Sequence, residues 1–173
     1  MRLKGKTALV TGGARGIGAG IATAFAAQGA AVMIADKDGA TAAATARSLV
    51  HHGGQAESVI ADVSVPTDCT RAVAACVETL GGLDVLVNNA GIISPMLHFF
   101  EADEAWWRRI IDVNLTGHFL CSHRAARIMA ANGAGVIINM SSGGATRAHR
   151  AFTAYDASKG GIEALTRAMA LDL

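Results

Sequence analysis

The sequence lacks a long apolar segment, a strong charge bias and a paired set of cysteines. No apolar run reaches the roughly 18 residues that a membrane-spanning helix needs, and the first residues do not resemble a signal peptide. Fifteen basic and fourteen acidic residues give a net charge of +1, which argues against nucleic-acid or polybasic membrane-binding surfaces. Three widely spaced cysteines indicate buried or free thiols in a reducing compartment. We therefore expect a soluble, cytoplasmic protein.

Apolar residues, in contrast, make up 51% of the chain and charged residues only 17%, a balance typical of an α/β protein with a buried sheet. Short apolar runs alternate with helical patterns, without a repeat or a linker. The expected strands cover residues 6–10, 31–35, 56–61, 83–87 and 136–140. This unbroken alternation predicts a doubly wound parallel sheet with right-handed crossovers, in a single domain that spans residues 1–173.

A glycine-rich turn follows the first expected strand. It runs from Thr11 to Gly18, has glycines at positions 12, 16 and 18, and leads into a helical pattern that starts at Ile17. Strand, glycine turn and helix form the opening of a nucleotide-binding unit, because glycines let the backbone approach a pyrophosphate at the helix N-terminus. The spacing differs from G-x-G-x-x-G, and no Gly-Lys-Ser/Thr follows, which excludes a P-loop.

The second expected strand leads into an acidic residue, Asp36. An acid about 20 residues beyond such a turn can accept hydrogen bonds from the adenosine ribose and would repel a 2′-phosphate, which favours NAD over NADP. Arg15 in the turn, which could reach a phosphate, and Lys37 are opposing hints. The alternative interpretation is that Asp36 only caps the helix that begins near Asp38.

The segment from Ser142 to Lys159 contains the only tyrosine of the chain and one of its four lysines. Tyr155 and Lys159 are four residues apart in a helical pattern, which puts both on one face about one turn apart. An ammonium favours the ionised form of a neighbouring phenol, so the pair can act as a tuned proton donor. In isolation the same spacing is more typical of a solvated helix face, so its interpretation depends on the rest of the chain.

Six motifs occur together in one order and spacing. They are Thr11-Gly-Gly-Ala-Arg-Gly-Ile-Gly18, Asp62-Val63, Asn88-Asn-Ala-Gly91, Asn114, Ser142 and Tyr155-x-x-x-Lys159. With these motifs the chain resembles the classical subgroup of the short-chain dehydrogenase/reductase family over essentially its whole length. It is similar to bacterial 3-oxoacyl-carrier-protein reductases and to sugar and steroid dehydrogenases, and the motifs do not separate these activities.

The resemblance implies a Rossmann-like fold and hydride transfer between NAD(P) and a secondary alcohol or ketone. The glycine turn would cradle the pyrophosphate, Asp36 would bind the ribose, and Asp62 with Val63 would border the adenine. Asn88 would stabilise the central strand beside the cofactor. The cofactor-binding residues that the resemblance implies are Gly12, Arg15, Gly16, Ile17, Gly18, Asp36, Asp62, Val63, Asn89, Ala90, Gly91, Tyr155 and Lys159.

The same resemblance implies four catalytic residues: Asn114, Ser142, Tyr155 and Lys159. Tyr155 would exchange a proton with the substrate oxygen, Ser142 would hydrogen-bond that oxygen, and Lys159 would favour the phenolate and hold the nicotinamide ribose. Ser142 is preferred to Ser141 because it lies thirteen residues before Tyr155, the usual family interval. Asn114 would hold a water in a proton relay. The alternative interpretation is that Asn114 is only a polar residue that interrupts a helix. That arrangement would cost free energy if the side chain were buried without a hydrogen-bond partner.

Two other groups of side chains give no specific site. His118, Cys121 and His123 do not predict a metal site, because their helical offsets of three and five residues spread them over a wide arc and no fourth ligand is apparent. The two arginines and the histidine of residues 147–150 could meet an anionic substrate or an acyl carrier. A solvated loop is the favoured interpretation of that segment.

The resemblance also implies a protein partner, and it implies that part of the family fold is absent from this sequence. Family members commonly pair through two helices, expected here over residues 101–131 and in the helix of Tyr155, so we expect a homo-oligomer. The chain stops at Leu173, before the last strands of the family fold and the loop that covers the nicotinamide. We expect a fragment of a longer gene product with an unpaired sheet edge, an aggregation hazard. The alternative function is a truncated, non-catalytic dinucleotide-binding or subunit-interaction protein.

Overall fold

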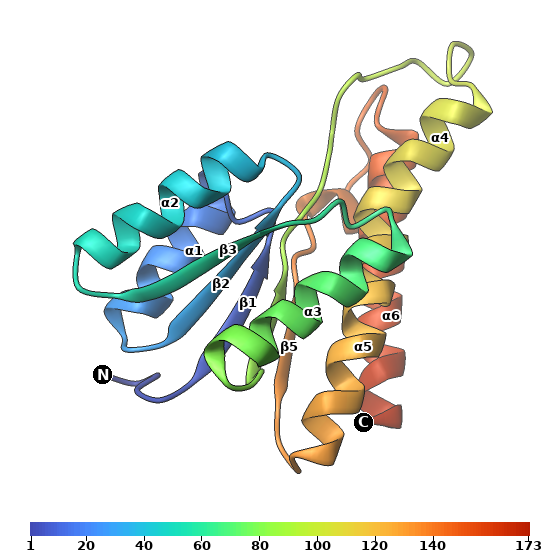
Figure 1. Ribbon diagram of the computed structural model, residues 1–173. Coiled ribbons are helices and arrows are strands. Elements are labelled where there is room, and N and C mark those ends of the chain that lie inside the picture. The colour runs from blue at the N-terminus through green and yellow to red at the C-terminus, as the bar shows by residue number, and fades with distance from the viewer.

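The computed structural model describes residues 1–173 and contains one parallel sheet with helices on both faces (Figure 1). The strands are β1 (Thr7–Thr11), β2 (Ala31–Asp36), β3 (Gln55–Ile60), β4 (Val85–Asn88) and β5 (Val136–Asn139). Their order is β3-β2-β1-β4-β5, and every pairing is parallel. The predicted doubly wound α/β fold is confirmed, and each strand lies within two residues of its predicted bounds.

Besides the strands the fold contains seven helical segments of α or π type and one short 3₁₀ turn, and the last two of these follow β5. They are α1 (Gly16–Ala27), α2 (Gly39–His51), α3 (Pro66–Leu80), α4 (Glu104–Ile111), the π-helical segment η1 (Asp112–Thr116), α5 (Gly117–Ala131), the 3₁₀ turn η2 (Gly143–Ala145) and α6 (Thr153–Asp172). Helices α1 and α2 cover one face of the sheet, and α3, α5 and α6 lie on the other (Figure 1). No helix combines the length and the apolar character that crossing a membrane requires.

The strand sequences explain which strands are central. All residues of β1 and β4 are buried, as are the first five of β2, because these strands are covered on both faces. The order of connections reverses between β1 and β4, so the loops after these two strands diverge and leave a crevice at their carboxyl ends. Strand β5 lies at one edge of the sheet and pairs only with β4. Its apolar side chains Val136 and Ile138 are 54% and 39% exposed.

The expected long helix over residues 101–131 needs correction. It begins only at Glu104, because the Asp103 carboxylate accepts the Trp106 N–H at 2.7 Å and caps the first turn. It is also not a uniform α-helix, since the π-helical segment η1 divides it and contains Asn114. Such a segment adds a residue to one turn and is frequent at functional sites.

Candidate functional site

The glycine turn after β1 is packed so tightly that two of its glycines have no room for a side chain. A Cβ on Gly12, whose φ is +63°, would lie 2.8 Å from the Cα of Ala90. A Cβ on Gly18 would overlap the carbonyl oxygen of Gly12 and lie 2.6 Å from the amide nitrogen of Asn89. The Asn89 amide donates to the carbonyl oxygens of Thr11 and Gly12, at 3.0 and 3.1 Å. The turn is therefore fixed to the loop that follows β4.

A cavity of about 470 Å³ opens beside this turn, at the crevice between β1 and β4. It is lined by Gly12, Arg15, Ile17, Gly18, Asp36, Lys37, Asp38, Ala61, Asp62, Val63, Asn89, Ala90, Gly91, Ile92 and Val113. Ten of the predicted cofactor-binding residues are among them. Gly16 is not in the wall; its φ of +57° serves the turn itself. Tyr155 and Lys159 also lie outside the wall of this cavity.

The charged side chains at the cavity are held in place. The Asp36 carboxylate accepts the N–H groups of Ala14 at 3.2 Å and of Asp38 at 3.0 Å, so it is fixed at the end of β2. Asp38, and not Asp36, caps α2 by accepting the Thr41 N–H at 3.1 Å. The interpretation of Asp36 as a helix cap is therefore wrong. Arg15, which could have reached a phosphate, forms an ion pair with Asp38.

Asp62 lies at the turn after β3, where its carboxylate accepts both the N–H and the hydroxyl of Ser64, at 2.9 and 2.6 Å. Burial acts to raise the pKa of Asp62, but the hydrogen bonds from Ser64 and the positive charge of Lys37 outweigh it and lower the pKa below 3.8. Asp62 is thus ionised at neutral pH. Its neighbour Val63 is buried and packs against Gly117, the first residue of α5.

Tyr155 and Lys159 share one face of α6, as their spacing predicted. The Lys159 ammonium lies 5.5 Å from the centre of the Tyr155 ring. It donates to the carbonyl oxygen of Met140, just beyond β5, at 2.8 Å. Only 5% of Lys159 is exposed, and this burial lowers its pKa from 10.5 to about 8. A buried ammonium therefore faces the phenol, close to the carboxyl ends of the strands.

Asn114 lies in the same region, but its side chain is not unpaired. It is fully buried, its Oδ1 accepts the Ile92 N–H at 2.8 Å, and its Nδ2 donates to the Ile92 carbonyl at 2.9 Å and to the Ser158 hydroxyl at 3.2 Å. The argument from the cost of an unpaired amide is therefore wrong, because the amide has protein partners. A Cβ on Gly91 would lie 3.4 Å from Asn114 Oδ1 and 3.8 Å from Lys159 Nζ, so Gly91 sits between the cavity and α6.

The two serines after β5 have different partners. Ser141 donates to Glu163 Oε1 at 3.1 Å, which ties it to α6. Ser142 begins the turn η2, and its hydroxyl oxygen accepts the Gly144 N–H at 3.3 Å. A Cβ on Gly144 would lie 3.3 Å from Cε1 of Tyr155, so the turn that Ser142 begins packs against the tyrosine ring. Ser142, Tyr155, Lys159 and Asn114 are thus gathered around the carboxyl ends of β4 and β5.

Two further buried residues lie in this region: Ser158 was missed in the sequence, and His118 was considered there only as a metal ligand. Ser158 connects Asn114 to α6 and also donates to the Tyr155 carbonyl at 2.6 Å. His118 is buried next to the end of β4. Burial, with the positive charge of Lys159, lowers its pKa from 6.5 to about 3, so its ring is neutral at physiological pH. His123 lies on an exposed face of the same helix and stacks on Phe119, so it does not converge with His118. Ser158 could have been suspected, since it lies one helical turn from Tyr155 and directly before Lys159.

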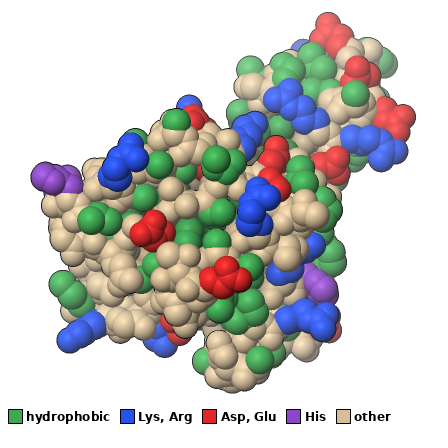
Figure 2. All heavy atoms as spheres, viewed as in Figure 1, with side chains coloured by type: hydrophobic (Ala, Val, Ile, Leu, Met, Phe, Trp, Pro, Cys, Tyr) green, Lys and Arg blue, Asp and Glu red, His purple; other side chains and the backbone are tan.

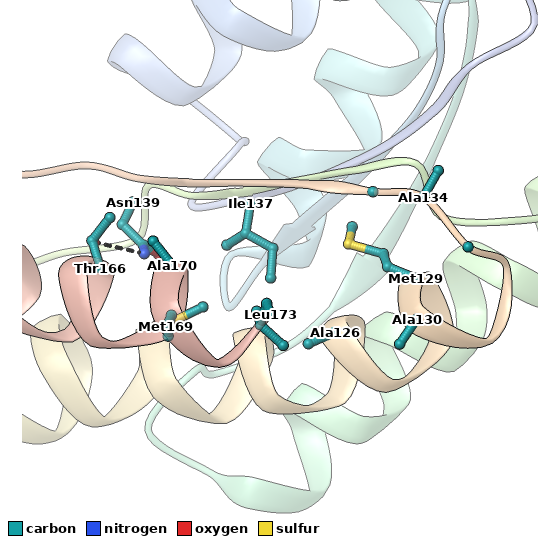
Figure 3. Close-up of a pocket in the computed structure, with 12 residues that line it drawn as sticks. Ala126, Met129, Ala130, Ala134, Ile137, Asn139, Thr166, Met169, Ala170 and Leu173 are labelled. Atoms are coloured by element: carbon teal, nitrogen blue, oxygen red, sulfur yellow. Dashed lines mark hydrogen bonds between the residues drawn. The ribbon is translucent and has the colours of Figure 1, made fainter.

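A larger cavity, of about 610 Å³, has a different character (Figure 3). It lies between β5 and the C-terminal halves of α5 and α6, and its wall is mostly alanine, glycine, methionine and leucine. Its two polar side chains are engaged with each other, since the Asn139 amide donates to the Thr166 hydroxyl at 3.0 Å (Figure 3). No titratable side chain lines it. This larger cavity therefore has no side chain that could act as a general acid or base, unlike the region of Tyr155.

Known proteins are similar to this chain in sequence and in fold. The family model of the short chain dehydrogenases matches residues 6–173. The chain belongs to the short-chain dehydrogenase family. An uncharacterized oxidoreductase of Thermotoga maritima is 42% identical over 171 residues, which cover 99% of the chain and 66% of that relative. Galactitol 2-dehydrogenase of Agrobacterium fabrum is 41% identical over 174 residues, covering 100% of the chain and 66% of that enzyme.

Solved structures agree with this assignment to the short-chain dehydrogenases. A crystal structure from Sinorhizobium meliloti 1021, provisionally described as a short-chain alcohol dehydrogenase, superposes with a TM-score of 0.94 at 39% identity. The match covers 98% of the chain and 67% of that protein. The chain spans just under two thirds of the length of the two curated relatives. The predicted family and the predicted Rossmann-like fold are therefore confirmed.

Proposed function

We propose that the protein is an NAD(P)-dependent oxidoreductase that transfers a hydride between a nicotinamide cofactor and a secondary alcohol or ketone. One observation carries the proposal: ten residues predicted to bind the cofactor line a single cavity, and Gly91 in its wall borders the buried Lys159 that faces Tyr155. A crevice at the switch point of a doubly wound sheet is the usual ligand site of such folds. Membership of the short-chain dehydrogenase family supports the same reaction class.

The side chains fit a dinucleotide. The N-terminus of α1 and the tight glycine turn suit a pyrophosphate, and Asp36 and Asp62 offer carboxylates to the ribose and adenine ends. When bound, the nicotinamide supplies the hydride chemistry. The Tyr155 hydroxyl would give a proton to the substrate oxygen in reduction and take it in oxidation. Ser142 would hydrogen-bond that oxygen, and Lys159 would hold positive charge next to the phenol.

A titration with NAD(H) followed by turnover assays on ketones and secondary alcohols, galactitol among them, tests this proposal. Cofactor binding with turnover of any substrate supports it. Binding without turnover would favour the alternative, a non-catalytic dinucleotide-binding or subunit-interaction protein. A chain that binds neither NAD(H) nor NADP(H) would overturn both the oxidoreductase and the dinucleotide-binding protein, and would leave only the subunit-interaction protein.

We propose that NAD is preferred to NADP, because Asp36 is fixed at the end of β2 and Arg15 is engaged by Asp38. Replacing Asp36 with asparagine removes the charge that would repel a 2′-phosphate. We expect the preference for NAD, measured as the ratio of the two dissociation constants, to fall at least about tenfold, a free-energy change of about 1.4 kcal/mol. Glu57→Gln, at an exposed position on β3, should leave the ratio unchanged. An unchanged ratio in Asp36→Asn would contradict this assignment.

We also propose a homo-oligomer that pairs through α5 and α6. A groove of about 350 Å³ runs between their outer faces, with Phe119 exposed at 48%. Arg127 of α5 and Asp172 of α6 both border it, so a two-fold axis could bring each against the opposite charge of a second copy. We expect light scattering to give at least a dimer mass, and Phe119→Asp to shift it toward the monomer. Val50→Asp, at an exposed site on α2, is the matched control.

A further inference from the structure

One carboxylate connects the two predicted catalytic residues Ser142 and Tyr155 through the loop between them. Asp156 follows Tyr155 directly in the first turn of α6, and its Oδ2 accepts the backbone N–H of His149 at 2.8 Å. Its Oδ1 lies 3.0 Å from the His149 ring nitrogen Nδ1. Both oxygens of the carboxylate therefore hold the same loop residue, once through the main chain and once through the side chain.

The same carboxylate also packs on the turn that begins at Ser142. A Cβ on Gly144 would overlap Asp156 Oδ1 and would lie 3.3 Å from Cε1 of Tyr155. The Gly144 N–H in turn donates to the Ser142 hydroxyl. Asp156 thus has the turn η2 on one side and the His149 segment on the other. Only a glycine at position 144 leaves the carboxylate room to make both contacts.

The loop between them adopts a conformation that needs such support. Ala151 has a φ of +66°, in the left-handed region that a residue with a Cβ rarely adopts. The rings of His149 and Phe152 are 5.6 Å apart, and those of Phe152 and Tyr155 are 5.9 Å apart. A continuous row of rings therefore joins the held histidine to the tyrosine. Residues in sparsely populated backbone conformations persist where the surrounding contacts fix them.

We propose that Asp156 is a positioning residue, whose carboxylate holds the loop 143–152 against α6 and so sets the place of Ser142 relative to Tyr155. This inference rests on the proposed function, in which these two residues act on one substrate oxygen. An aspartate suits the position because both of its oxygens accept and the His149 segment presents two donors, one main-chain and one ring N–H. An asparagine offers a single, uncharged accepting oxygen in place of two charged ones, so it holds the two donors more weakly.

Arg147 and Arg150 make the loop accessible to a direct test. Both are exposed, they flank His149, and trypsin cleaves after arginine in mobile segments. We expect Asp156→Ala to raise the rate of tryptic cleavage after Arg147 and Arg150 at least tenfold, and Asp156→Asn to give an intermediate rate. Cleavage after Arg47, on α2, is the internal control, because a global loss of stability would raise cleavage there as well. Glu78→Ala, at an exposed site on α3, controls for loss of a carboxylate.

The kinetic prediction concerns the catalytic step and not cofactor binding, since Asp156 is not in the wall of the dinucleotide cavity. In a chain that turns over substrate, we expect Asp156→Asn to lower kcat/KM about tenfold while the NAD dissociation constant stays within twofold. A loop whose cleavage rate is the same in parent and Asp156→Ala would overturn the inference, as would unaltered kcat/KM. Absence of turnover in the parent would count against the proposed function alone, because the digestion still decides whether Asp156 holds the loop.

Discussion

Replacing Tyr155 with phenylalanine is expected to lower turnover by a factor of about 10³ or more while leaving the protein folded. Phenylalanine keeps the ring that packs against Gly144 and that lies 5.9 Å from Phe152. It removes only the hydroxyl, which in the proposed reaction is the group that exchanges a proton with the substrate oxygen. General acid–base catalysis typically contributes 10²–10⁴-fold, so a loss near the middle of this range or above is expected.

Two measurements make the Tyr155→Phe result specific. The NAD dissociation constant should stay within about threefold of the parent value, because the tyrosine is outside the wall of the dinucleotide cavity. The midpoint of thermal unfolding should change little, since the ring and its packing contacts are retained. A variant that keeps more than a tenth of the parent turnover would show that another group exchanges the proton, and the assignment of Tyr155 would then be wrong.

The sheet was predictable from the sequence because its strands are short apolar runs that are separated by helical patterns. The β1 strand, for example, was recognisable from a buried apolar run that ends in glycines, and all its residues are buried in the fold. The π-helical segment at Asn114 was not predictable in this way. It depends on contacts far away in the chain, such as the bonds of the Asn114 amide to Ile92 and the packing of Gly117 against Val63. No local sequence pattern predicts these contacts.

The candidate site also has parts that were predictable from the sequence and parts that were not. The glycine turn and Asp36 were predicted from spacing alone, and both line one cavity because parallel strands bring their carboxyl ends together. The role of Asp156 was hidden, since its bonds to His149 exist only when the loop turns back at Ala151. Asn114 was predicted to be catalytic from the family resemblance, with the cost of a buried amide without partners as an added argument. Its partners Ile92 and Ser158 come from separate segments that the sequence does not place side by side.

Replacing Lys159 with methionine is expected to abolish turnover and, at neutral pH, to make the protein more stable. Methionine keeps an unbranched apolar side chain, one atom shorter than that of lysine, and removes a buried charge. Burial lowers the pKa of Lys159 from 10.5 to about 8, so the folded state disfavours the ammonium that the unfolded chain carries freely. Each pKa unit corresponds to about 1.4 kcal/mol. Because the bond to the Met140 carbonyl is also lost, we expect a net gain of roughly 1–3 kcal/mol in the free energy of unfolding.

The gain in the free energy of unfolding is expected to depend on pH. Below about pH 8 the lysine is charged in both the folded and the unfolded state, so the full cost of the buried charge is present in the parent. Between about pH 8 and 10.5 the unfolded chain binds the proton and the folded protein releases it, so the stability of the parent rises with pH relative to the variant. Urea unfolding at pH 7 and pH 10 should therefore show a gain for Lys159→Met that shrinks at the higher pH.

Lys4→Met, at an exposed position, should show neither the gain nor its pH dependence. A Lys159→Met variant that is less stable than the parent at pH 7 would mean that the ammonium stabilises the fold, and that its place beside Tyr155 needs no functional reason. A variant that is more stable but inactive would mean that the buried ammonium lowers the stability of the fold and is needed for turnover. A buried charge that costs stability, and that faces the only tyrosine of the chain across 5.5 Å, is then retained for the chemistry it supports.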